Sequence, residues 1–366
     1  MKNKKWIAVT ITGAFIGLVG VLLMLQGNPK NMGLCIACFI RDTAGALKLH
    51  TAAPVMYARP EIMGLILGAF VISLVTREFR ARGGSSPLTR FFLGFMVMVG
   101  ALVFLGCPLR MVLRMAAGDL NAWIGLVGFL LGVYIGSLFL KRGFSLGRTH
   151  KLNAFEGAIV PVLQVPLFIM LALASPLLAY SEAGPGSMRA SIWLALGLAF
   201  VIGILAQRSR ICQAGGFRDL FMIGDPHLFW GNVGILVVAF VYNLATNNFN
   251  LGLYHQPVAH SQWIWNILGL AVVGLGSVLL GGCPMRQLVM TGTGNVDSAI
   301  TVLGLIAGAA FSHNFGLASA ADAYEEGTSL VIGGGTTANG RIAVVASLVI
   351  MLALGFIYTK RSKAKS

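Results

Sequence analysis

Ten apolar runs constrain this chain more than any other feature of its sequence. Each is long enough, or nearly long enough, to cross a hydrocarbon core that requires about 20 helical residues. The runs occupy residues 7–27, 62–76, 91–106, 122–140, 157–180, 190–207, 231–246, 264–282, 298–315 and 342–358. Because only helices and closed barrels satisfy their backbone hydrogen bonds in lipid, the runs predict an all-α polytopic membrane protein of ten spans.

The charge of the chain agrees with this class and argues against a nucleic-acid-binding function. Only 11% of the residues are charged, against roughly 25% in soluble domains. The net charge of +15 comes from Lys and Arg that lie between the apolar runs, not from a basic helix face. Nineteen of the 27 Lys and Arg fall in alternate loops and the two tails, so the positive-inside rule predicts that both termini are cytoplasmic.

An internal duplication further restricts the fold. The pentapeptide Gly-Cys-Pro-Leu-Arg at 106–110 returns as Gly-Cys-Pro-Met-Arg at 282–286. A second motif has a cysteine followed six and seven positions later by Arg and Asp, at Cys35, Arg41 and Asp42 and again at Cys212, Arg218 and Asp219. The copies lie 176 or 177 residues apart, which is too long for a solenoid and fits the repeats of membrane transporters. Five spans separate equivalent points, and because five is odd, we expect the second copy to be inverted.

Each repeated motif predicts a short helix that enters the membrane without crossing it. The stretch 32–42 is apolar for less than half a bilayer, which is typical of a re-entrant segment buried in protein. In the pentapeptides, a proline that follows a glycine turn favours the first position of a helix. Cys107 and Cys283 are therefore predicted to be N-caps, at the helix end that attracts anions.

The duplication also predicts the domain organisation. We expect a first membrane repeat at 1–156, a linking kinked span at 157–189, a second repeat at 190–341, and a terminal span with a basic cytoplasmic tail at 342–366. The acidic stretch 316–341 is expected to be an external loop. Glycines four residues apart on one helix face predict close helix packing, and those that recur in both copies are Gly128, Gly132, Gly304 and Gly308.

Cysteines and arginines are the candidate site residues. A free cysteine is usually an ordinary buried side chain, but four of the five here recur at symmetry-related places, at Cys35, Cys107, Cys212 and Cys283. An arginine at membrane depth is costly and indicates a functional site by default. The arginines that recur beside these cysteines are Arg41, Arg110, Arg218 and Arg286.

Other polar residues near the motifs have simpler expected roles. Arg114 has Met290 as its counterpart, so we expect it to reach the membrane interface. Asp42 and Asp219 directly follow arginines, and because adjacent side chains do not face each other on a helix, each is expected to pair with another element. The histidines have no ligand-spaced cysteine or carboxylate beside them, so no metal and no cofactor is predicted at His255, His260 and His313.

The spacing Cys35-x-x-Cys38 leaves an enzymatic alternative open. A dithiol of this spacing suits a thiol-disulfide oxidoreductase that faces the oxidising side of the membrane. However, Cys38 is the one cysteine that the duplication does not repeat. An oxidase would also leave the repeated Cys-Pro-x-Arg motifs without a role. A passive anion channel, which would use the same residues, is the other alternative.

With these motifs in hand, the chain resembles the YeeE/YedE family of sulfur-compound transporters and, within it, the YedE-like selenium transporters. The resemblance runs from Gly33-Leu34-Cys35 through both Gly-Cys-Pro-x-Arg motifs. It implies inverted halves with short membrane-penetrating helices, and cysteines that pass an anion along a central pathway. Those roles would fall on Cys35, Cys107 and Cys283, with Cys212 as the symmetry mate of Cys35 and Cys38 as a departure from the pattern.

The resemblance, together with the motifs, predicts an inner-membrane permease and not an enzyme. The expected substrate is a small sulfur- or selenium-containing oxyanion, such as thiosulfate, that passes the cysteines in a positive potential supplied by the arginines. The expected partners are this anion, the lipid bilayer and, by family analogy, a cytosolic sulfurtransferase-like acceptor.

Overall fold

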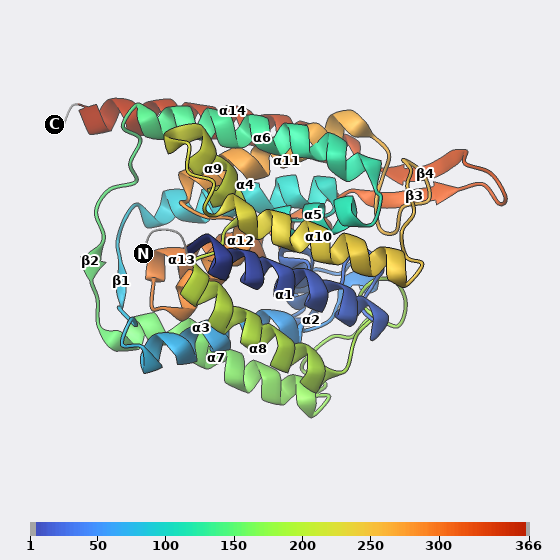
Figure 1. Cartoon of the computed structure of the whole chain (residues 1–366), viewed down its shortest axis with the longest axis horizontal. Helices are drawn as coiled ribbons and strands as arrows, with labels where there is room; N and C mark the ends of the chain where they lie inside the picture. Colours follow the sequence, from blue (N-terminus) through green and yellow to red (C-terminus); the bar gives the residue numbers. More distant parts are fainter. Residues whose placement is uncertain (1–4, 364–366) are drawn as a thin grey trace.

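The computed structural model of the protein describes residues 5–363 and is predominantly helical (Figure 1). The first four and last three residues, which hold part of each basic tail, lie outside this range. The long helices are α1 (Lys5–Leu25), α3 (Pro60–Val75), α4 (Pro87–Phe104), α6 (Leu120–Lys141), α7 (Ala154–Ala172), α8 (Ile192–Ser209), α10 (Phe229–Ala245), α11 (Trp263–Leu279), α13 (Val296–Asn314) and α14 (Ala338–Lys363). The short helices are α2 (Ile36–Ala46), the 3₁₀ turn η2 (Ala53–Val55), α5 (Pro108–Ala116), α9 (Gln213–Ile223) and α12 (Pro284–Gly292).

The long helices correspond to the ten apolar runs. In the described range, nine helical segments are long and apolar enough to cross a membrane, and α10 is a further apolar helix of slightly shorter length. Four of the nine segments combine a long helix with a short one: η2 with α3, α4 with α5, α8 with α9, and α11 with α12. The prediction of an all-α polytopic membrane protein is confirmed.

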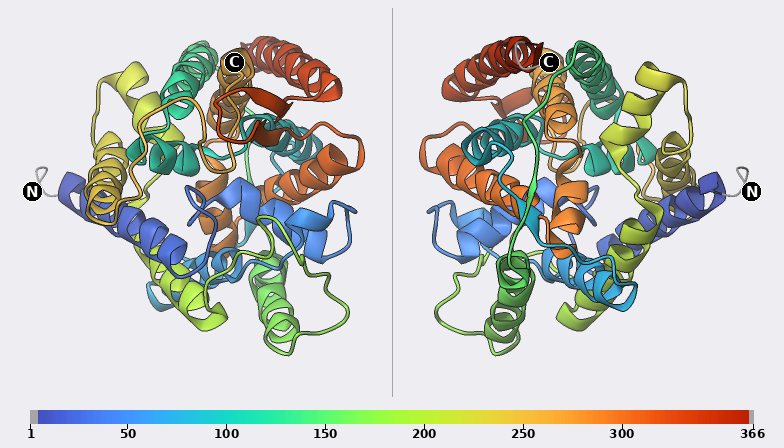
Figure 2. Two further views of the ribbon diagram at one scale, coloured as in Figure 1. Left: turned by 90° about the vertical axis from the view of Figure 1, so that its right-hand side faces the viewer. Right: turned by 90° about the vertical axis from the view of Figure 1, so that its left-hand side faces the viewer.

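Four short helices occupy the places where half-helices were predicted. They have 11, 9, 11 and 9 residues in chain order, which at 1.5 Å per residue is about half of a 30 Å hydrocarbon core. Every residue of α2 and α5 is buried. Seen end-on, α5 and α12 lie inside a surround of longer helices, whereas α9 lies at the edge (Figure 2) and only its residues 213–216 are buried.

The long helices pack in pairs that repeat across the duplication. Helix α1 packs on α10 as its counterpart α8 packs on α3, and α6 packs on α11 as α13 packs on α4. Each of these pairs joins one copy to the other, so the two copies are interleaved. The boundaries of the repeats stay a prediction, but the packing has the two-fold pattern that such repeats would give.

Glycines produce the closest of these contacts. A Cβ atom at Gly128 would overlap the carbonyl oxygen of Ile267 in α11, and one at the counterpart Gly304 would overlap that of Phe91 in α4. The same holds one turn further along, at Gly132 against Ala271 and at Gly308 against Phe95. The prediction of close packing at the recurring glycines is confirmed, because only a residue without a side chain lets the backbones approach this closely.

Replacing Gly128 with alanine is expected to lower the thermal unfolding midpoint of the purified protein. The added methyl group must push α6 away from α11, and overpacking of this kind costs about 1–3 kcal/mol. Gly197 in α8 is the matched control, because it is also helical and has nothing within 4 Å of an added Cβ. Gly197→Ala should leave the midpoint unchanged or raise it; equal losses for the two variants would contradict the packing argument.

Two small antiparallel sheets interrupt the helical pattern. Strand β1 (Arg82–Gly83) pairs with β2 (His150–Lys151), and β3 (Ala320–Tyr324) pairs with β4 (Val331–Gly335). The second pair forms a hairpin that projects from the helices (Figure 1). The stretch 316–341, which is predicted to be an external loop, thus contains a β-hairpin that the sequence did not predict. Gly333 and Gly335 both pair with β3 in this hairpin.

Candidate functional site

All four repeated cysteines are N-caps of short helices. The prediction for Cys107 and Cys283 is confirmed, since α5 and α12 each begin at the following proline. Cys35 and Cys212 have the same position before α2 and α9, and there the sulfur also accepts a backbone N–H bond, from Cys38 at 3.4 Å and from Gly215 at 3.3 Å. The sequence did not predict these two caps because no proline follows them.

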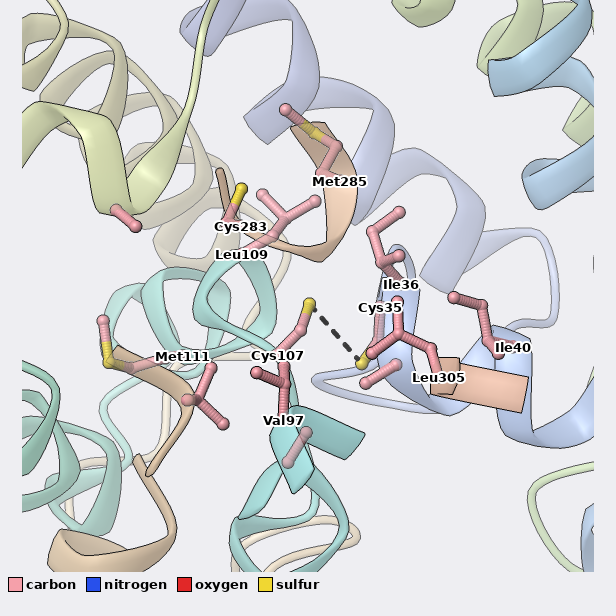
Figure 3. Close-up of a cluster of buried hydrophobic side chains, with 14 of the residues drawn as sticks. Cys35, Ile36, Ile40, Val97, Cys107, Leu109, Met111, Cys283, Met285 and Leu305 are labelled. Carbon is pink, nitrogen blue, oxygen red and sulfur yellow. Dashed lines mark hydrogen bonds between the residues drawn. The ribbon is translucent and has the colours of Figure 1, made fainter. Parts of the chain in front are cut away.

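The cysteines of the first repeat lie together in the protein interior. The sulfurs of Cys35 and Cys107 are 4.0 Å apart, and both side chains are fully buried. The sulfur of Cys38 lies 3.9 Å from the carbonyl oxygen of Leu105. Figure 3 shows Cys35 and Cys107 with Cys283 among buried apolar side chains that include Leu109, Met285 and Ile36.

The cysteines of the second repeat make a different set of contacts. The backbone N–H of Cys283 donates to the sulfur of Cys212 at 3.4 Å, and the Cys283 thiol donates to Oε1 of Gln213 at 2.9 Å. Gln213 occupies the place that Ile36 has in the first copy. Gln213 is not among the site residues predicted from the sequence, although this exchange of an apolar for a polar residue is visible in the duplication.

Arg110 brings a buried positive charge to the first cysteine cluster. Its guanidinium is 3.8 Å from the sulfur of Cys38 and donates to the carbonyl oxygens of Asn31 at 2.9 Å, of Val258 at 3.0 Å and of Leu105. Within the described chain, no carboxylate lies at ion-pair distance from Arg110. A cation that is held by neutral carbonyl oxygens and a thiol keeps its attraction for an anion.

Arg41 and Arg218 are instead ion-paired. Nη2 of Arg41 lies 2.6 Å from Asp42, and Nη2 of Arg218 lies 2.8 Å from Asp219. The expectation that neither aspartate pairs with its preceding arginine is wrong, because the long guanidinium side chain can turn back to the next residue. The expectation that each aspartate pairs with another element is met by Asp42, which also accepts a hydrogen bond from Arg59 at 2.8 Å.

The prediction that Arg114 reaches the membrane interface is wrong. It is fully buried, its Nε donates to Asp119 at 2.6 Å, and its guanidinium lies 4.3 Å from the centre of the Phe104 ring. Asp119 is the N-cap of α6. The turn between α5 and α6 thus supplies the carboxylate that makes burial of this arginine tolerable.

Arg286, the counterpart of Arg110, lines a polar cavity of about 400 Å³ that we call the basic cavity. Its walls come from the loops after α3 and α8 and from α12, and they hold four arginines and one glutamate. The lining residues are Glu78, Arg80, Arg82, Gln207, Arg210, Arg286, Met290 and Thr293. Arg286 follows Cys283 by three residues on α12, so the cavity adjoins the second cysteine cluster.

The histidines have structural neighbours. Nε2 of His260 lies 2.7 Å from the carbonyl oxygen of Val103, and the ring of His313 lies 4.7 Å from that of His50. His255 contacts Ser329 of the hairpin loop at 3.2 Å. The described residues contain no group of three or more His, Cys, Asp or Glu that could hold a metal ion.

The fold and the cysteine clusters define a polytopic membrane protein built on repeated, buried half-helices. A family model described as "Sulphur transport" matches residues 2–135 and 208–366, which include all five cysteines. The chain therefore belongs to this sulphur transport family, and the resemblance to YeeE/YedE proteins is confirmed.

Individual relatives match parts of the chain. The thiosulfate transporter TsuA of Spirochaeta thermophila is 34% identical over 103 residues, which are 28% of this chain and 31% of the relative. TsuA of Escherichia coli is 29% identical over 102 residues, 28% of each chain. A protein named "Probable transporter YedE" from Salmonella typhimurium is 25% identical over 254 residues, 61% of this chain and 56% of the relative. The matches thus span about a third of the TsuA proteins and about half of YedE.

Proposed function

We propose that the protein imports a small sulfur-containing oxyanion, such as thiosulfate or a selenium analogue, across the inner membrane. The proposed pathway passes Cys35, Cys107, Cys283 and Cys212. One observation supports it above all: each of the four repeated cysteines stands at the N-terminus of a short helix. The names of the TsuA relatives suggest the substrate class.

The chemistry of these helix ends suits a soft anion. The N-terminus of a helix presents free N–H groups and a partial positive charge. A neutral thiol adds a weak S–H donor and a polarizable sulfur. A thiolate would repel the substrate, so the proposal requires the cysteines to keep their protons while the anion passes. Contacts of this kind hold the anion weakly enough to let it leave, as conduction requires.

The apolar residues around the cysteines suggest that the pathway is closed in this conformation. Ile36, Leu109 and Met285 are fully buried beside the sulfurs (Figure 3). Each is a residue of a short helix, α2, α5 or α12. Passage of an anion would therefore require these helices to shift, which favours a transporter with conformational steps over a passive channel.

The basic cavity fits the inner end of this pathway. The positive-inside rule puts both termini and the loops after α3 and α8 on the cytoplasmic side, and these loops supply Arg80, Arg82 and Arg210. Four arginines against one glutamate would attract an anion that leaves the second cysteine cluster. A cytosolic sulfurtransferase-like acceptor would meet the substrate at this cavity.

The oxidoreductase alternative receives less support. The sulfur of Cys35 lies 4.0 Å from that of Cys107. A mechanism that uses only the Cys35–Cys38 dithiol gives Cys107 no role. The alternative also leaves the contact between Cys212 and Cys283 unexplained.

Uptake by purified protein in liposomes tests the proposal. We expect labelled thiosulfate to enter protein-containing vesicles faster than protein-free ones. Unlabelled thiosulfate should compete better than sulfate, because it offers the soft terminal sulfur that a thiol contacts best. Labelled selenite, added in parallel, decides whether selenium species share the pathway. Uptake equal to that of protein-free vesicles for every anion would refute the proposal.

A further inference from the structure

A second cavity lies where α7 ends and α8 begins, and none of the five cysteines is in its lining. It measures about 490 Å³ and is lined by Tyr57, Tyr180, Arg189 and Ser191, together with apolar residues of the same segments. We call it the tyrosine cavity. Neither the proposed pathway nor the repeated motifs involve it, and it has no acidic side chain in its lining.

The polar groups of the tyrosine cavity are all able to donate hydrogen bonds. The guanidinium of Arg189 lies 4.9 Å from the centre of the Tyr57 ring and 5.9 Å from that of Tyr180. Stacking of this kind fixes the plane of the guanidinium and leaves its N–H edge available. Among the described residues, Arg189 has no carboxylate at ion-pair distance.

Among the described residues, the hydroxyls of Tyr57 and Tyr180 have no hydrogen-bond partner. Tyr57 is only 2% exposed, and the hydroxyl oxygens of both Tyr57 and Tyr180 are buried without a hydrogen bond. A buried hydroxyl without a hydrogen bond is unfavourable, so a ligand that supplies an acceptor would be favoured. The guanidinium of Arg59 lies 5.2 Å from the centre of the Tyr57 ring, and this contact helps to hold the tyrosine side chain in place.

The N-terminus of α8 completes the set of donors. Ser191 is the N-cap of this 18-residue helix and makes no side-chain cap bond, so the first N–H groups of the helix receive no hydrogen bond from it. Ser191 and Ile192 are both in the cavity lining. The guanidinium of Arg189, the two tyrosine side chains and the start of α8 therefore border one space. All of them suit an oxyanion.

We propose that the tyrosine cavity binds an oxyanion group, and that the phosphate of an anionic phospholipid fits it best. The volume exceeds what a free tetrahedral anion fills, and Leu171, Ala174 and Ile192 add apolar wall to it. Close by, Leu173 and Trp193 are exposed on the surface, at 75% and 68%, as lipid-facing side chains are. This inference does not depend on the transport function.

The test measures binding of two kinds of ligand to the full protein. In one arm, phosphatidylglycerol is titrated against phosphatidylcholine and bound lipids are counted by native mass spectrometry. In the other, free thiosulfate and inorganic phosphate are titrated and followed by calorimetry. The variants are Arg189→Gln and Tyr57→Phe. The second variant removes the hydroxyl but keeps the ring that contacts Arg59 and Arg189. The control is Arg341→Gln, since Arg341 stacks on Trp265 at 5.4 Å but is not among the residues that line the tyrosine cavity.

We expect one phosphatidylglycerol to bind in preference to phosphatidylcholine, and Arg189→Gln to weaken it about tenfold, as the loss of one charged hydrogen bond implies. Tyr57→Phe should weaken it less, and Arg341→Gln not at all. If free anions bind instead with the same sensitivity to Arg189→Gln, the oxyanion site stands and the lipid is replaced as its ligand. Binding of both ligand kinds that is unchanged in Arg189→Gln and Tyr57→Phe would overturn the inference.

Discussion

Replacing Cys107 with alanine is expected to reduce the initial rate of thiosulfate uptake into proteoliposomes by about 100-fold, equivalent to about 2.7 kcal/mol in the transfer barrier. The Cys107 sulfur is 4.0 Å from that of Cys35, so its removal leaves a gap in the proposed row of sulfur contacts. The backbone should be unaffected, because the thiol makes no cap bond to α5. Cys283→Ala, the symmetry-related change, is expected to have a similar effect.

The matched control is Cys38→Ala. This cysteine is as fully buried as Cys107, but Gly215 takes its place in the second copy. Its sulfur contacts the Leu105 carbonyl oxygen and the Arg110 guanidinium rather than the Cys107 sulfur. Uptake should therefore remain close to that of the wild type. The reverse result, in which Cys38→Ala abolishes uptake and Cys107→Ala does not, would favour the dithiol oxidoreductase.

Much of the fold was predictable because membrane insertion makes hydrophobic length a strong signal. The ten runs became ten apolar helices, and the prolines at 108 and 284 correctly indicated where two short helices begin. The interleaving of the two copies was not predictable, since it depends on which glycine faces which backbone. Gly128 and Gly304 show small-residue spacing in the sequence, but their partners in α11 and α4 are known only from the structure.

The charged residues were harder to place, because their cost depends on partners brought together by turns. Arg114 was predicted to lie at the membrane interface. Instead it is buried, because Asp119, five positions later and across a turn, forms an ion pair with it. Arg80, Arg82 and Arg210 were counted only as loop charges that set orientation. The structure gathers them with Arg286 from separate segments into one cavity, and nothing in their spacing indicates this.

Asp42 offers the largest expected effect on stability. Its carboxylate contacts Arg41 at 2.6 Å and Arg59 at 2.8 Å, and all three side chains are almost fully buried. Asp42→Asn keeps the shape of the side chain but leaves two buried guanidinium groups without a negative partner. Breaking a buried ion pair in this way costs about 3–5 kcal/mol. A pronounced drop in the thermal unfolding midpoint of the detergent-solubilised protein should follow.

The duplication supplies the control for this prediction, in the form of Asp219→Asn. Asp219 makes the equivalent contact to Arg218 at 2.8 Å, but the two side chains are 21% and 26% exposed. Among the described residues, no second arginine lies at ion-pair distance from Asp219. Because water can solvate the charge that remains, the loss should stay below about 1 kcal/mol. Since the two variants make the same chemical change at equivalent places, any difference between them measures burial and the second arginine. Equal losses of stability would mean that neither burial nor the second arginine determines how much the ion pair stabilises the protein.

Asp42→Asn should also slow uptake. Asp42 lies on α2, the helix that begins at Cys35, and a displaced α2 would move the Cys35 sulfur away from Cys107.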